Sequence, residues 1–380
     1  MPQKKHNPPP QPPQKILIVL LSEMGSLVLA YPMIKHLTDR YPHSELSILV
    51  FEQNREALEL LDVIKGENTL TIRDDSLTHF FYDSIKIIRK LRRIQLDAVI
   101  DCELFSRASS LLSYLSGAFI RSGFHPYTQE GLYRGNFINR PVLYNPYLHI
   151  SQQFLNLAYA LEINTVPNVK HRISNELLHL PRKQISDVEI NAYSIKLQKY
   201  FPRLVERRLV LIYPSGGLLP IRAWPLDNYC VLSKALIDEG LLVGIIGLHQ
   251  DGLFAEKIIK FAGSDNCVDL TGYTSTLKEL LVLMRQADLL VTNDGGPAQF
   301  GALLEIPSIV FFGPESPQLY SPLSSSAYCF YQQLSCSPCL TAYNHRNSPC
   351  DGDNQCLKRI TVDEVLDKAR QMLDNPGIIC

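Results

Sequence analysis

The sequence predicts an α/β protein in which two doubly wound domains, each with a mostly parallel sheet, follow one another along the chain. Three observations lead to this class. The chain has 380 residues, which is more than one hydrophobic core usually fills. Continuous apolar runs alternate with segments of helical periodicity, as is typical of parallel sheets covered by helices. The same alternation restarts near residue 208.

The first half contains three predicted strands and one clear amphipathic helix. The run "KILIVLL" (15–21) is apolar throughout, so it predicts a strand that is buried on both faces. The segment "SLVLAYPMIKHLTDRY" (26–41) has helical spacing, with Leu29, Met33 and Leu37 on one side. Two further strands are predicted at "ELSILVFE" (45–52) and "LDAVIDCE" (96–103).

The second half repeats this alternation. Strands are predicted at 208–217, 241–248, 266–273, 289–296 and 308–314, and helices at 228–240 and 276–287. Between the halves the chain is mixed in character and carries prolines. We therefore expect the following organisation: a disordered Pro-rich arm at 1–14, a first domain at 15–165, a linker at 166–195, and a second domain at 196–373 with a Cys-rich loop at 336–356.

The composition excludes several classes of protein. Lys and Arg number 37 against 38 Asp and Glu, and this balance argues against a dedicated nucleic-acid binder. No apolar run reaches the ~18 residues that a membrane-spanning helix needs. The segment "MPQKKHNPPPQPPQ" lacks the apolar core of a secretory signal. We therefore expect a cytoplasmic protein.

Nine cysteines are present, and four of them cluster late in the chain. An odd count without an export signal favours reduced thiols. The cluster comprises Cys336, Cys339, Cys350 and Cys356. Its spacing leaves three interpretations open, namely a structural metal site, a disulfide or redox pair, and free packed thiols. In each case the cysteines would stabilise the loop and would take no part in catalysis.

Three turns of the second half suit an anionic ligand. In open α/β sheets, ligands bind beyond the carboxyl ends of the strands. The turn "PSGG" (214–217) has small residues that let backbone N–H groups approach an anion, and Arg222 adds a positive charge. A plain tight turn with a surface arginine is the alternative. We expect the sole tryptophan, Trp224, to pack rather than to stack on a ligand.

The second and third turns are "DLTGYT" (269–274) and "NDGGPAQ" (293–299). We expect Asp294 to cap a helix that starts near Pro297, and Gly295 and Gly296 to permit positive φ and close ligand approach. A purely structural cap is the alternative. Three such turns together indicate a nucleotide-diphosphate site. The glycine fingerprints of dinucleotide and P-loop enzymes are absent, which disfavours those classes.

A fourth turn, "LLSEMGSLVLAYP" (20–32), follows the first strand. Gly25 frees its backbone, and Glu23 supplies a carboxylate that could take a proton from an attacking hydroxyl. A solvated glutamate before a helix is the alternative.

Several of these motifs, in this order, resemble glycosyltransferase family 9, the ADP-heptose:lipopolysaccharide heptosyltransferases. They are "KILIVLLSEMGSLVLAYPMIKHL", "PSGGLLPIRAWPLDNYCVLSKAL", "DLTGYTSTLKELLVLMRQADLLVTNDGGPAQFGALLEIPSIVFFGPESP" and "CSPC…NQCLKRITVDEVL". The resemblance implies a GT-B fold, in which two Rossmann-like domains face a central cleft. It also implies inverting transfer without a metal or other cofactor, the acceptor binding to the first domain and the sugar nucleotide to the second.

The resemblance also assigns residues. The family's donor loop "D-[ST]-G-x-x-H" corresponds to Asp294, Gly295, Gly296 and Gln299, and the lysine of "K-x-W-P" corresponds to Arg222. The glycine of "L-T-G" corresponds to Gly272, and the small-residue loop to Ser215, Gly216 and Gly217. A charged side chain and helix-start amides can hold a leaving diphosphate without Mg²⁺.

Two positions depart from the family pattern. Ser26 stands where the family has the aspartate proposed as general base, and Gln299 stands where it has histidine. Glu23 becomes the candidate base, with Asp101 and Glu103 in reserve. Together with Ser26, these two reserve residues are also the candidate acceptor contacts. Two arginines, Arg107 and Arg121, would either contact an anionic acceptor or form surface salt bridges.

A basic amphipathic helix is predicted at 81–97, with Ile85, Ile88 and Leu91 along one side. It either covers the sheet with a solvated basic face or contacts anionic lipid at the inner membrane surface.

The predicted function is transfer of a sugar, plausibly heptose, from a nucleotide diphosphate to lipopolysaccharide core or a related glycan. Two alternatives are an inactive nucleotide-sugar-binding protein of the same fold and an epimerase-like enzyme.

Overall fold

The computed structural model describes residues 12–125, 134–163, 173–182, 185–202, 207–350 and 352–374. The chain divides into two compact units, Met1–His179 and Leu180–Cys380. Most of the predicted Pro-rich arm 1–14 lies outside the described residues, as do residues 166–172 and 183–184 of the predicted linker. Among the described residues, none of the helices combines the length and apolar character needed to cross a membrane.

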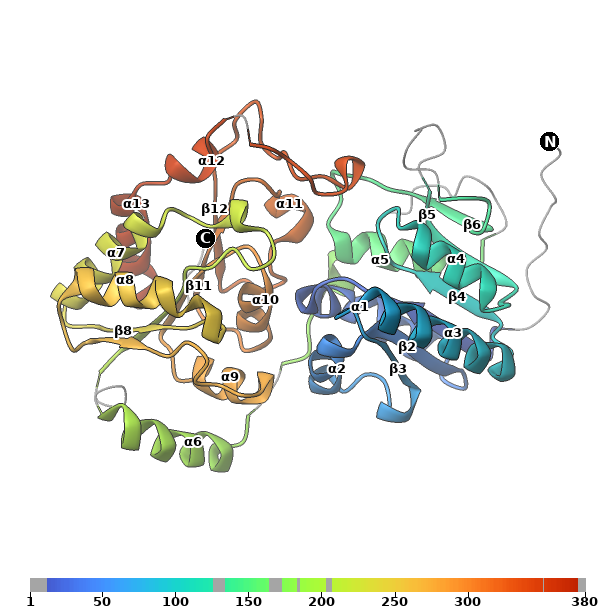
Figure 1. The fold of residues 1–380 in the computed structure, drawn as a ribbon, viewed down its shortest axis with the longest axis horizontal. Coiled ribbons are helices and arrows are strands. Elements are labelled where there is room, and N and C mark those ends of the chain that lie inside the picture. Colours follow the sequence, from blue (N-terminus) through green and yellow to red (C-terminus); the bar gives the residue numbers. More distant parts are fainter. Residues whose placement is uncertain are drawn as a thin grey trace. The chain divides into compact units, whose positions relative to one another are not determined.

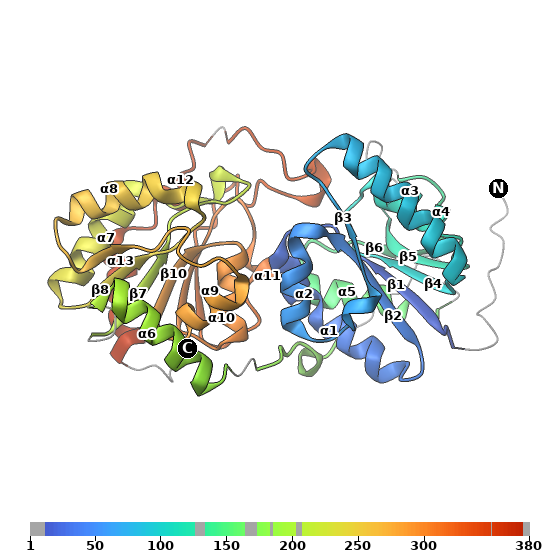
Figure 2. The ribbon, with the colours of Figure 1, turned by 60° about the horizontal axis from the view of Figure 1, so that its bottom comes forward.

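The first unit is a parallel six-stranded sheet with the strand order β3-β2-β1-β4-β5-β6. Its elements are β1 (Lys15–Val19), α1 (Met24–Arg40), β2 (Glu45–Phe51), α2 (Arg55–Leu61), β3 (Thr69–Ile72), α3 (Leu77–Ile94), β4 (Ala98–Asp101), α4 (Arg107–Leu115), β5 (Ile120–His125), β6 (Arg140–Leu143) and α5 (Ile150–Tyr159). Helices α3 and α4 cover one face of the sheet, whereas α1 and α5 pack together on the other (Figures 1 and 2).

The second unit repeats this topology with the order β12-β11-β10-β7-β8-β9, again all parallel. Its elements are α6 (Asp187–Tyr200), β7 (Leu209–Tyr213), α7 (Leu226–Asp238), β8 (Leu242–Ile245), α8 (Gly252–Ala262), β9 (Cys267–Asp269), α9 (Leu277–Met284), β10 (Leu289–Asn293), α10 (Gly296–Leu303), β11 (Ser308–Phe312), α11 (Pro317–Tyr320), β12 (Ala327–Tyr331), α12 (Gln355–Lys358) and α13 (Val362–Asp374). The α/β prediction is confirmed in both units.

The apolar periodicity explains these elements. Strand β1 is buried along nearly its whole length, and Leu29, Met33 and Leu37 form the buried side of α1 as predicted. The larger core of the second unit lies between its sheet and helices α7, α8 and α13. This burial holds the central strands β1, β4, β7 and β10 in place. Most of the candidate site residues lie beyond the carboxyl ends of these strands, and Gly272 follows the outer strand β9.

Two expectations differ from the structure. Helix α6 begins at Asp187, inside the segment 166–195, because Ser186 and Glu189 form a capping box that starts a helix there. In α3 the buried side contains Ile87 and Leu91, whereas Ile85 is 50% exposed. Leu91 is buried as predicted and Ile88 is half-buried, so only Ile85 of the predicted apolar side faces solvent.

Candidate active site

The turn after β7 has a backbone that only small residues permit. Gly217 adopts φ of +60°, a left-handed conformation that favours glycine. A Cβ atom at Gly216 would lie 2.7 Å from the carbonyl oxygen of Leu219, so this position also excludes side chains. The hydroxyl of Ser215 accepts a hydrogen bond of 3.2 Å from the Gly217 amide. The turn is therefore a tight loop at the carboxyl end of β7, in which Gly217 is exposed and Ser215 and Gly216 are buried.

Arg222 and Asp294 lie close together in the second unit. Arg222 ends a short 3₁₀ turn at Pro220–Arg222 and is 4% exposed. Its Nη1 lies 3.9 Å from Oδ2 of Asp294, and its Nη2 lies 3.5 Å from the carbonyl oxygen of Gly216. A guanidinium is thus held between the turn that follows β7 and the turn that follows β10. This is the juxtaposition that a diphosphate site at these turns requires.

The start of α10 differs in detail from the prediction. The N-cap is Gly295 rather than Asp294, and no side-chain hydrogen bond caps the helix. Gly295 has φ of 162°, which is extended backbone, and Gly296 lies inside the helix, so neither needs a positive φ. Asp294 faces Arg222 instead of the helix end. A Cβ at Gly295 would meet nothing within 4 Å, so this position is open to a ligand.

Gln299 and Gly272 complete the predicted donor set. The Nε2 of Gln299 donates a hydrogen bond of 3.0 Å to the carbonyl oxygen of Tyr320, which fixes the side chain against α11. Its Oε1 is buried and has no hydrogen-bond partner among the described residues. Gly272 adopts φ of +65°, and its amide donates to the carbonyl oxygen of Gly247. Gln299 therefore offers a buried acceptor, and Gly272 ties the turn after β9 to the turn after β8.

Sequence reasoning missed Asn293, the last residue of β10. Its Oδ1 accepts hydrogen bonds from the Trp224 amide at 2.8 Å and from the Tyr229 hydroxyl at 2.9 Å. Its Nδ2 donates to the carbonyl oxygens of Pro214 and Ser215 at 3.1 and 3.0 Å. One fully buried amide therefore fixes the turn after β7 and the segment that follows Arg222. Only its position beside Asp294 could have drawn attention to it.

Trp224 is a packing residue, as predicted. Its ring stacks on Phe311 with ring centroids 4.6 Å apart, and its Nε1 donates to the carbonyl oxygen of Ile360 at 3.0 Å. Only 1% of the residue is exposed. The tryptophan therefore anchors the segment that carries Arg222 to the core of the second unit.

The loop after β1 carries the predicted acceptor-side residues of the first unit. Glu23 precedes α1 as its N-cap residue, in an extended conformation, and its carbonyl oxygen accepts a hydrogen bond of 2.9 Å from the Ser26 amide. Both residues are half-buried, and Gly25 between them is buried. Glu23 as the base stays a prediction.

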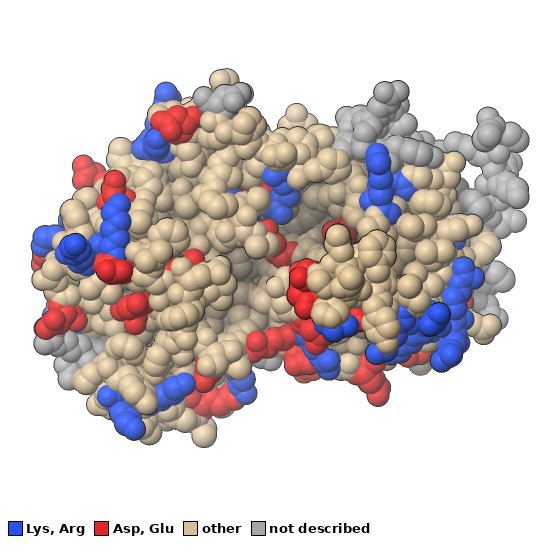
Figure 3. Space-filling model, viewed as in Figure 1, with Lys and Arg blue, Asp and Glu red and all other residues tan. Residues whose placement is uncertain are grey.

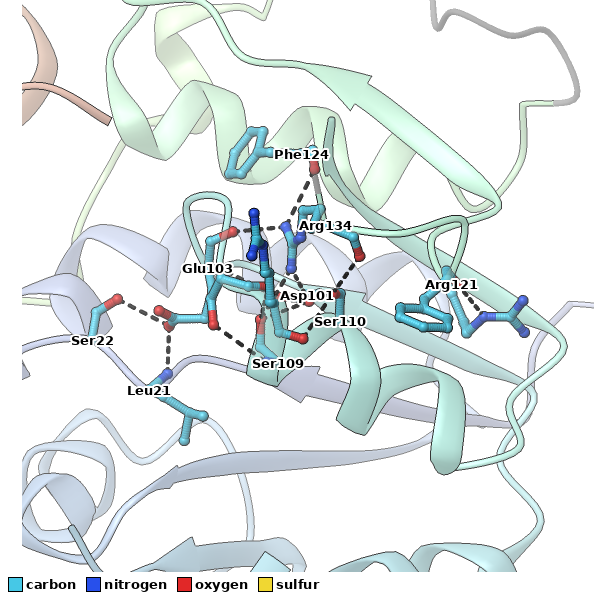
Figure 4. Close-up of polar contacts among 12 residues, drawn as sticks. Leu21, Ser22, Asp101, Glu103, Ser109, Ser110, Arg121, Phe124 and Arg134 are labelled. Atoms are coloured by element: carbon cyan, nitrogen blue, oxygen red, sulfur yellow. Dashed lines mark hydrogen bonds and ion pairs between the residues drawn. The ribbon is translucent and has the colours of Figure 1, made fainter. Parts of the chain in front are cut away.

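Asp101 cannot serve as an acceptor contact. It is completely buried at the end of β4, where it pairs with the buried guanidinium of Arg134 (Figure 4). Its two oxygens also accept hydrogen bonds from the Glu103 amide at 3.0 Å and from the Ser109 hydroxyl at 2.9 Å. A carboxylate in this position neutralises Arg134 and organises the end of the strand. The expectation that it would contact an acceptor is wrong, because Arg134 and the core enclose it.

Glu103, two residues further on, lies in a different environment. Its Oε1 accepts hydrogen bonds from the Leu21 amide at 2.6 Å and from the Ser22 hydroxyl at 3.0 Å, so it joins the loop after β4 to the loop after β1 (Figure 4). Burial, and then the charge of Asp101, raise the pKa of the Glu103 carboxyl from 4.5 to about 7. The residue is half-buried, so part of its surface is accessible.

The two arginines named from the sequence have different roles. Arg121 donates hydrogen bonds to the carbonyl oxygens of Phe137 and Ala118, and its guanidinium lies 5.5 Å from the ring centroid of Tyr114. These contacts support the fold of the first unit rather than an acceptor. Arg107 is exposed at the first residue of α4.

The cysteine cluster contains free thiols. All four of its members are reduced, as are the other four described cysteines, and Cys380 lies outside the described residues. Burial and the neighbouring thiols raise the pKa of Cys356 to about 11. Within the described ranges, no group of three or more His, Cys, Asp or Glu side chains is arranged to hold a metal ion.

The two parallel sheets with their covering helices place the chain in a structural class, the GT-B fold. The solved structure of ADP-heptose lipopolysaccharide heptosyltransferase II from Escherichia coli superposes with a TM-score of 0.72 at 22% identity, covering 96% of this chain and all of that one. The E. coli heptosyltransferase WaaC, solved with ADP-2-deoxy-2-fluoro heptose, gives a TM-score of 0.61 at 16% identity, covering 94% and 99% of the two chains.

Sequence comparison identifies the family. The chain is 23% identical to lipopolysaccharide heptosyltransferase 2 of Salmonella typhimurium over 381 aligned positions, which cover 96% of this chain and all of that protein. The model of glycosyltransferase family 9 (heptosyltransferase) matches residues 84–348. The chain therefore belongs to glycosyltransferase family 9 and is a glycosyltransferase.

Proposed function

We propose that this chain transfers heptose from an ADP-heptose-like donor to the core of lipopolysaccharide or a related glycan, with inversion at the anomeric carbon and without a metal ion. The observation that carries the donor half is the convergence of Arg222, the turn 214–217 and the start of α10 in the second unit. The relative with the fluorinated sugar nucleotide supports a diphosphate donor. The names of the heptosyltransferase relatives support the sugar and the acceptor.

The second unit supplies charge where the leaving group needs it. As the bond between the anomeric carbon and the diphosphate breaks, negative charge develops on the phosphate oxygens. The Arg222 guanidinium carries a permanent positive charge, and the N-terminal amides of α10 add the positive end of the helix dipole. Displacement by an acceptor hydroxyl from the opposite face inverts the configuration in one step.

Arg222→Ala tests this proposal. Removing the guanidinium should weaken binding of ADP roughly 10- to 100-fold, because a hydrogen bond to a charged group contributes about 1.5–3 kcal/mol. Arg222→Lys should recover part of the affinity. Isothermal titration calorimetry with ADP provides the binding measurement, and release of ADP from ADP-heptose in the presence of truncated lipopolysaccharide provides the activity.

The control is Arg182→Ala, since Arg182 is 80% exposed in an ion pair with Glu305 and lies in the same unit. Equal ADP affinity in Arg222→Ala and the wild type would contradict the proposed donor site. Tight ADP binding without transfer to any acceptor would instead favour a sugar-nucleotide-binding protein.

We further propose that α3 contacts an anionic membrane surface, at the cytoplasmic face where a glycolipid acceptor would lie. Five cations of this helix are exposed, and Figure 3 shows Lys and Arg gathered over it. They are Lys86, Arg89, Lys90, Arg92 and Arg93. The sole acid of the helix, Asp83, is paired with Arg73 at 2.8 Å. Next to these cations the helix exposes large apolar groups, namely Leu77 at 77%, Phe81 at 63%, Tyr82 at 66% and Ile85 at 50%.

Charge and apolar surface together fit a lipid headgroup layer. Each cation near an anionic surface contributes about 1 kcal/mol, and the exposed aromatic side chains suit the interface. The double variant Arg89→Gln/Lys90→Gln should therefore bind vesicles containing phosphatidylglycerol about 30-fold more weakly in a sedimentation assay. The matched control changes Lys234 and Lys257, two exposed cations of the second unit. Equal sedimentation with neutral phosphatidylcholine vesicles would contradict the proposal.

A further inference from the structure

The proposed reaction needs a group that removes the proton of the acceptor hydroxyl, and the inference that follows rests on that proposed function. The loop after β1 has Ser26 at the position where an acid would be expected from the family pattern. A neutral serine hydroxyl is too weak a base at neutral pH. Three carboxylates lie in or beside this loop in the first unit: Glu23, Asp101 and Glu103.

Asp101 is excluded by its contacts. Its Oδ2 is engaged by Arg134 and by Ser109, and its Oδ1 by the Glu103 amide. It is completely buried, so a substrate hydroxyl does not reach it. Its role is to neutralise Arg134 and to hold the turn that begins at the end of β4.

Glu103 is held rigidly by that turn. Its amide donates to Asp101, and its carbonyl oxygen accepts a hydrogen bond of 2.9 Å from Arg134, so the main chain is fixed on both sides. Its side chain reaches across to β1, where Oε1 accepts from the Leu21 amide and the Ser22 hydroxyl. The Ser22 carbonyl oxygen in turn accepts from the buried Asn54 side chain at 2.6 Å. Such preorganisation is what a proton-transfer group requires.

The two oxygens of the Glu103 carboxylate are therefore not equivalent. Oε1 is engaged by two donors from the loop after β1 (Figure 4). Oε2 has no hydrogen-bond partner among the residues that the structure describes, and the side chain is only half-buried. One oxygen thus anchors the group, and the other has lone pairs to receive a proton.

We propose that Glu103 is the general base of this enzyme, and that it takes the role that Ser26 cannot perform. The acceptor hydroxyl gives its proton to Oε2 of Glu103 while an oxygen lone pair forms the new bond to the anomeric carbon. The bond from that carbon to the diphosphate breaks, and its electron pair leaves with the phosphate oxygen. Glu103 then returns the proton to water after the products depart.

The ionisation of Glu103 suits this role. A pKa of about 7 leaves a substantial fraction ionised at neutral pH and makes the carboxylate a stronger base than an ordinary glutamate. The charged groups that face it are Asp101, which raises its pKa, and Arg134, which lowers it. Glu23 is the acid of the loop after β1, and His125, at the end of β5, has its own pKa lowered by burial and by Arg134.

The test compares Glu103→Gln with Glu23→Gln. Glutamine keeps an oxygen for Leu21 and Ser22 but cannot accept the proton. Glu103→Gln should lower kcat for heptose transfer from ADP-heptose to truncated lipopolysaccharide by about 10²- to 10⁴-fold, with ADP affinity unchanged by calorimetry. The Glu23→Gln variant should lose less rate than Glu103→Gln, and the matched control Glu59→Gln, at an exposed acid of the same unit, should stay within threefold of the wild type. A Glu103→Gln rate within threefold of the wild type, or a Glu23→Gln rate that falls instead, overturns the inference.

A second measurement needs no variant. In the wild type, kcat/KM should fall tenfold per pH unit below about pH 7 and level off above it, because only ionised Glu103 can act. A flat profile from pH 5.5 to pH 8 overturns the inference while leaving the proposed function intact. Absence of transfer by the wild type with every ADP-sugar and acceptor overturns the proposed function and this inference with it.

Discussion

The two units share one topology and each holds an arginine beside an aspartate at the end of a central strand, yet the two pairs have different geometry. In the first unit Arg134 and Asp101 are in direct contact and fully buried. In the second unit Arg222 and Asp294 are 3.9 Å apart, longer than the 2.7–2.9 Å of a charge-assisted hydrogen bond. The contact pair supports the structure, whereas the looser pair lies between loops suited to an anion. Residue type alone does not separate these roles.

The largest expected effect comes from breaking the contact pair. Asp101→Asn removes the charge that neutralises buried Arg134, and loss of one partner of a buried ion pair typically costs about 3–5 kcal/mol of stability. Asp294→Asn should cost only about 1 kcal/mol, because its pairing with Arg222 is looser. Urea unfolding of both variants measures the difference. Equal losses of unfolding free energy would show that the two pairs are energetically alike.

An intermediate effect should appear as a pH dependence of stability. The pKa of Glu103 is about 7 in the folded chain and 4.5 ordinarily, so between these values the folded state binds the proton more tightly than the unfolded state. The free energy of unfolding therefore falls as pH rises through this window. Glu103→Gln abolishes this contribution, and its stability relative to the wild type should grow by about 2–3 kcal/mol between pH 5 and pH 8.

The measurement is urea unfolding of the wild type and Glu103→Gln at several pH values. Parallel stability curves for the two proteins would mean that Glu103 titrates alike in the folded and unfolded chains. The first unit would then lack the raised pKa of Glu103 that suits it to proton transfer and distinguishes it from the second unit.

The smallest effect separates backbone strain from function. Gly217 and Gly240 both adopt positive φ, at +60° and +88°, and a Cβ at either would meet no atom closer than 3.8 Å. Gly217→Ala and Gly240→Ala should therefore each cost about 1 kcal/mol of stability. Only Gly217→Ala should also weaken ADP binding in calorimetry, since Gly240 follows α7 and lies outside the candidate site. Equal ADP affinity in both variants would remove the turn after β7 from the donor site.

Much of the fold could be predicted because its central strands are buried on both faces. Strands β1, β7, β10 and β11 are continuous apolar runs, and such runs carry a strong local signal. Strand β12, by contrast, is half-buried along its whole length, and its mixed sequence gives little indication of an edge strand.

The candidate site could be predicted only where the functional groups are neighbours in the sequence. The small residues of the turn after β7 and the cation at Arg222 could be recognised from neighbours in the sequence. The difference between Asp101 and Glu103 could not. It depends on Arg134, 33 residues away from Asp101, and on a main-chain amide at Leu21, 82 residues away from Glu103. The capping role expected of Asp294 was wrong for a similar reason, because Arg222 competes for its carboxylate.

The four hydrogen bonds of Asn293 have a consequence for engineering. Because a single carboxamide serves the turn after β7 with its N–H groups and the Trp224 segment with its oxygen, the two loops share one point of attachment. A change in the length of either loop alone, or its replacement, would disturb the Asn293 hydrogen bonds that also hold the other loop. Redesign of sugar-nucleotide preference in this scaffold would have to exchange both loops and this asparagine as one cassette.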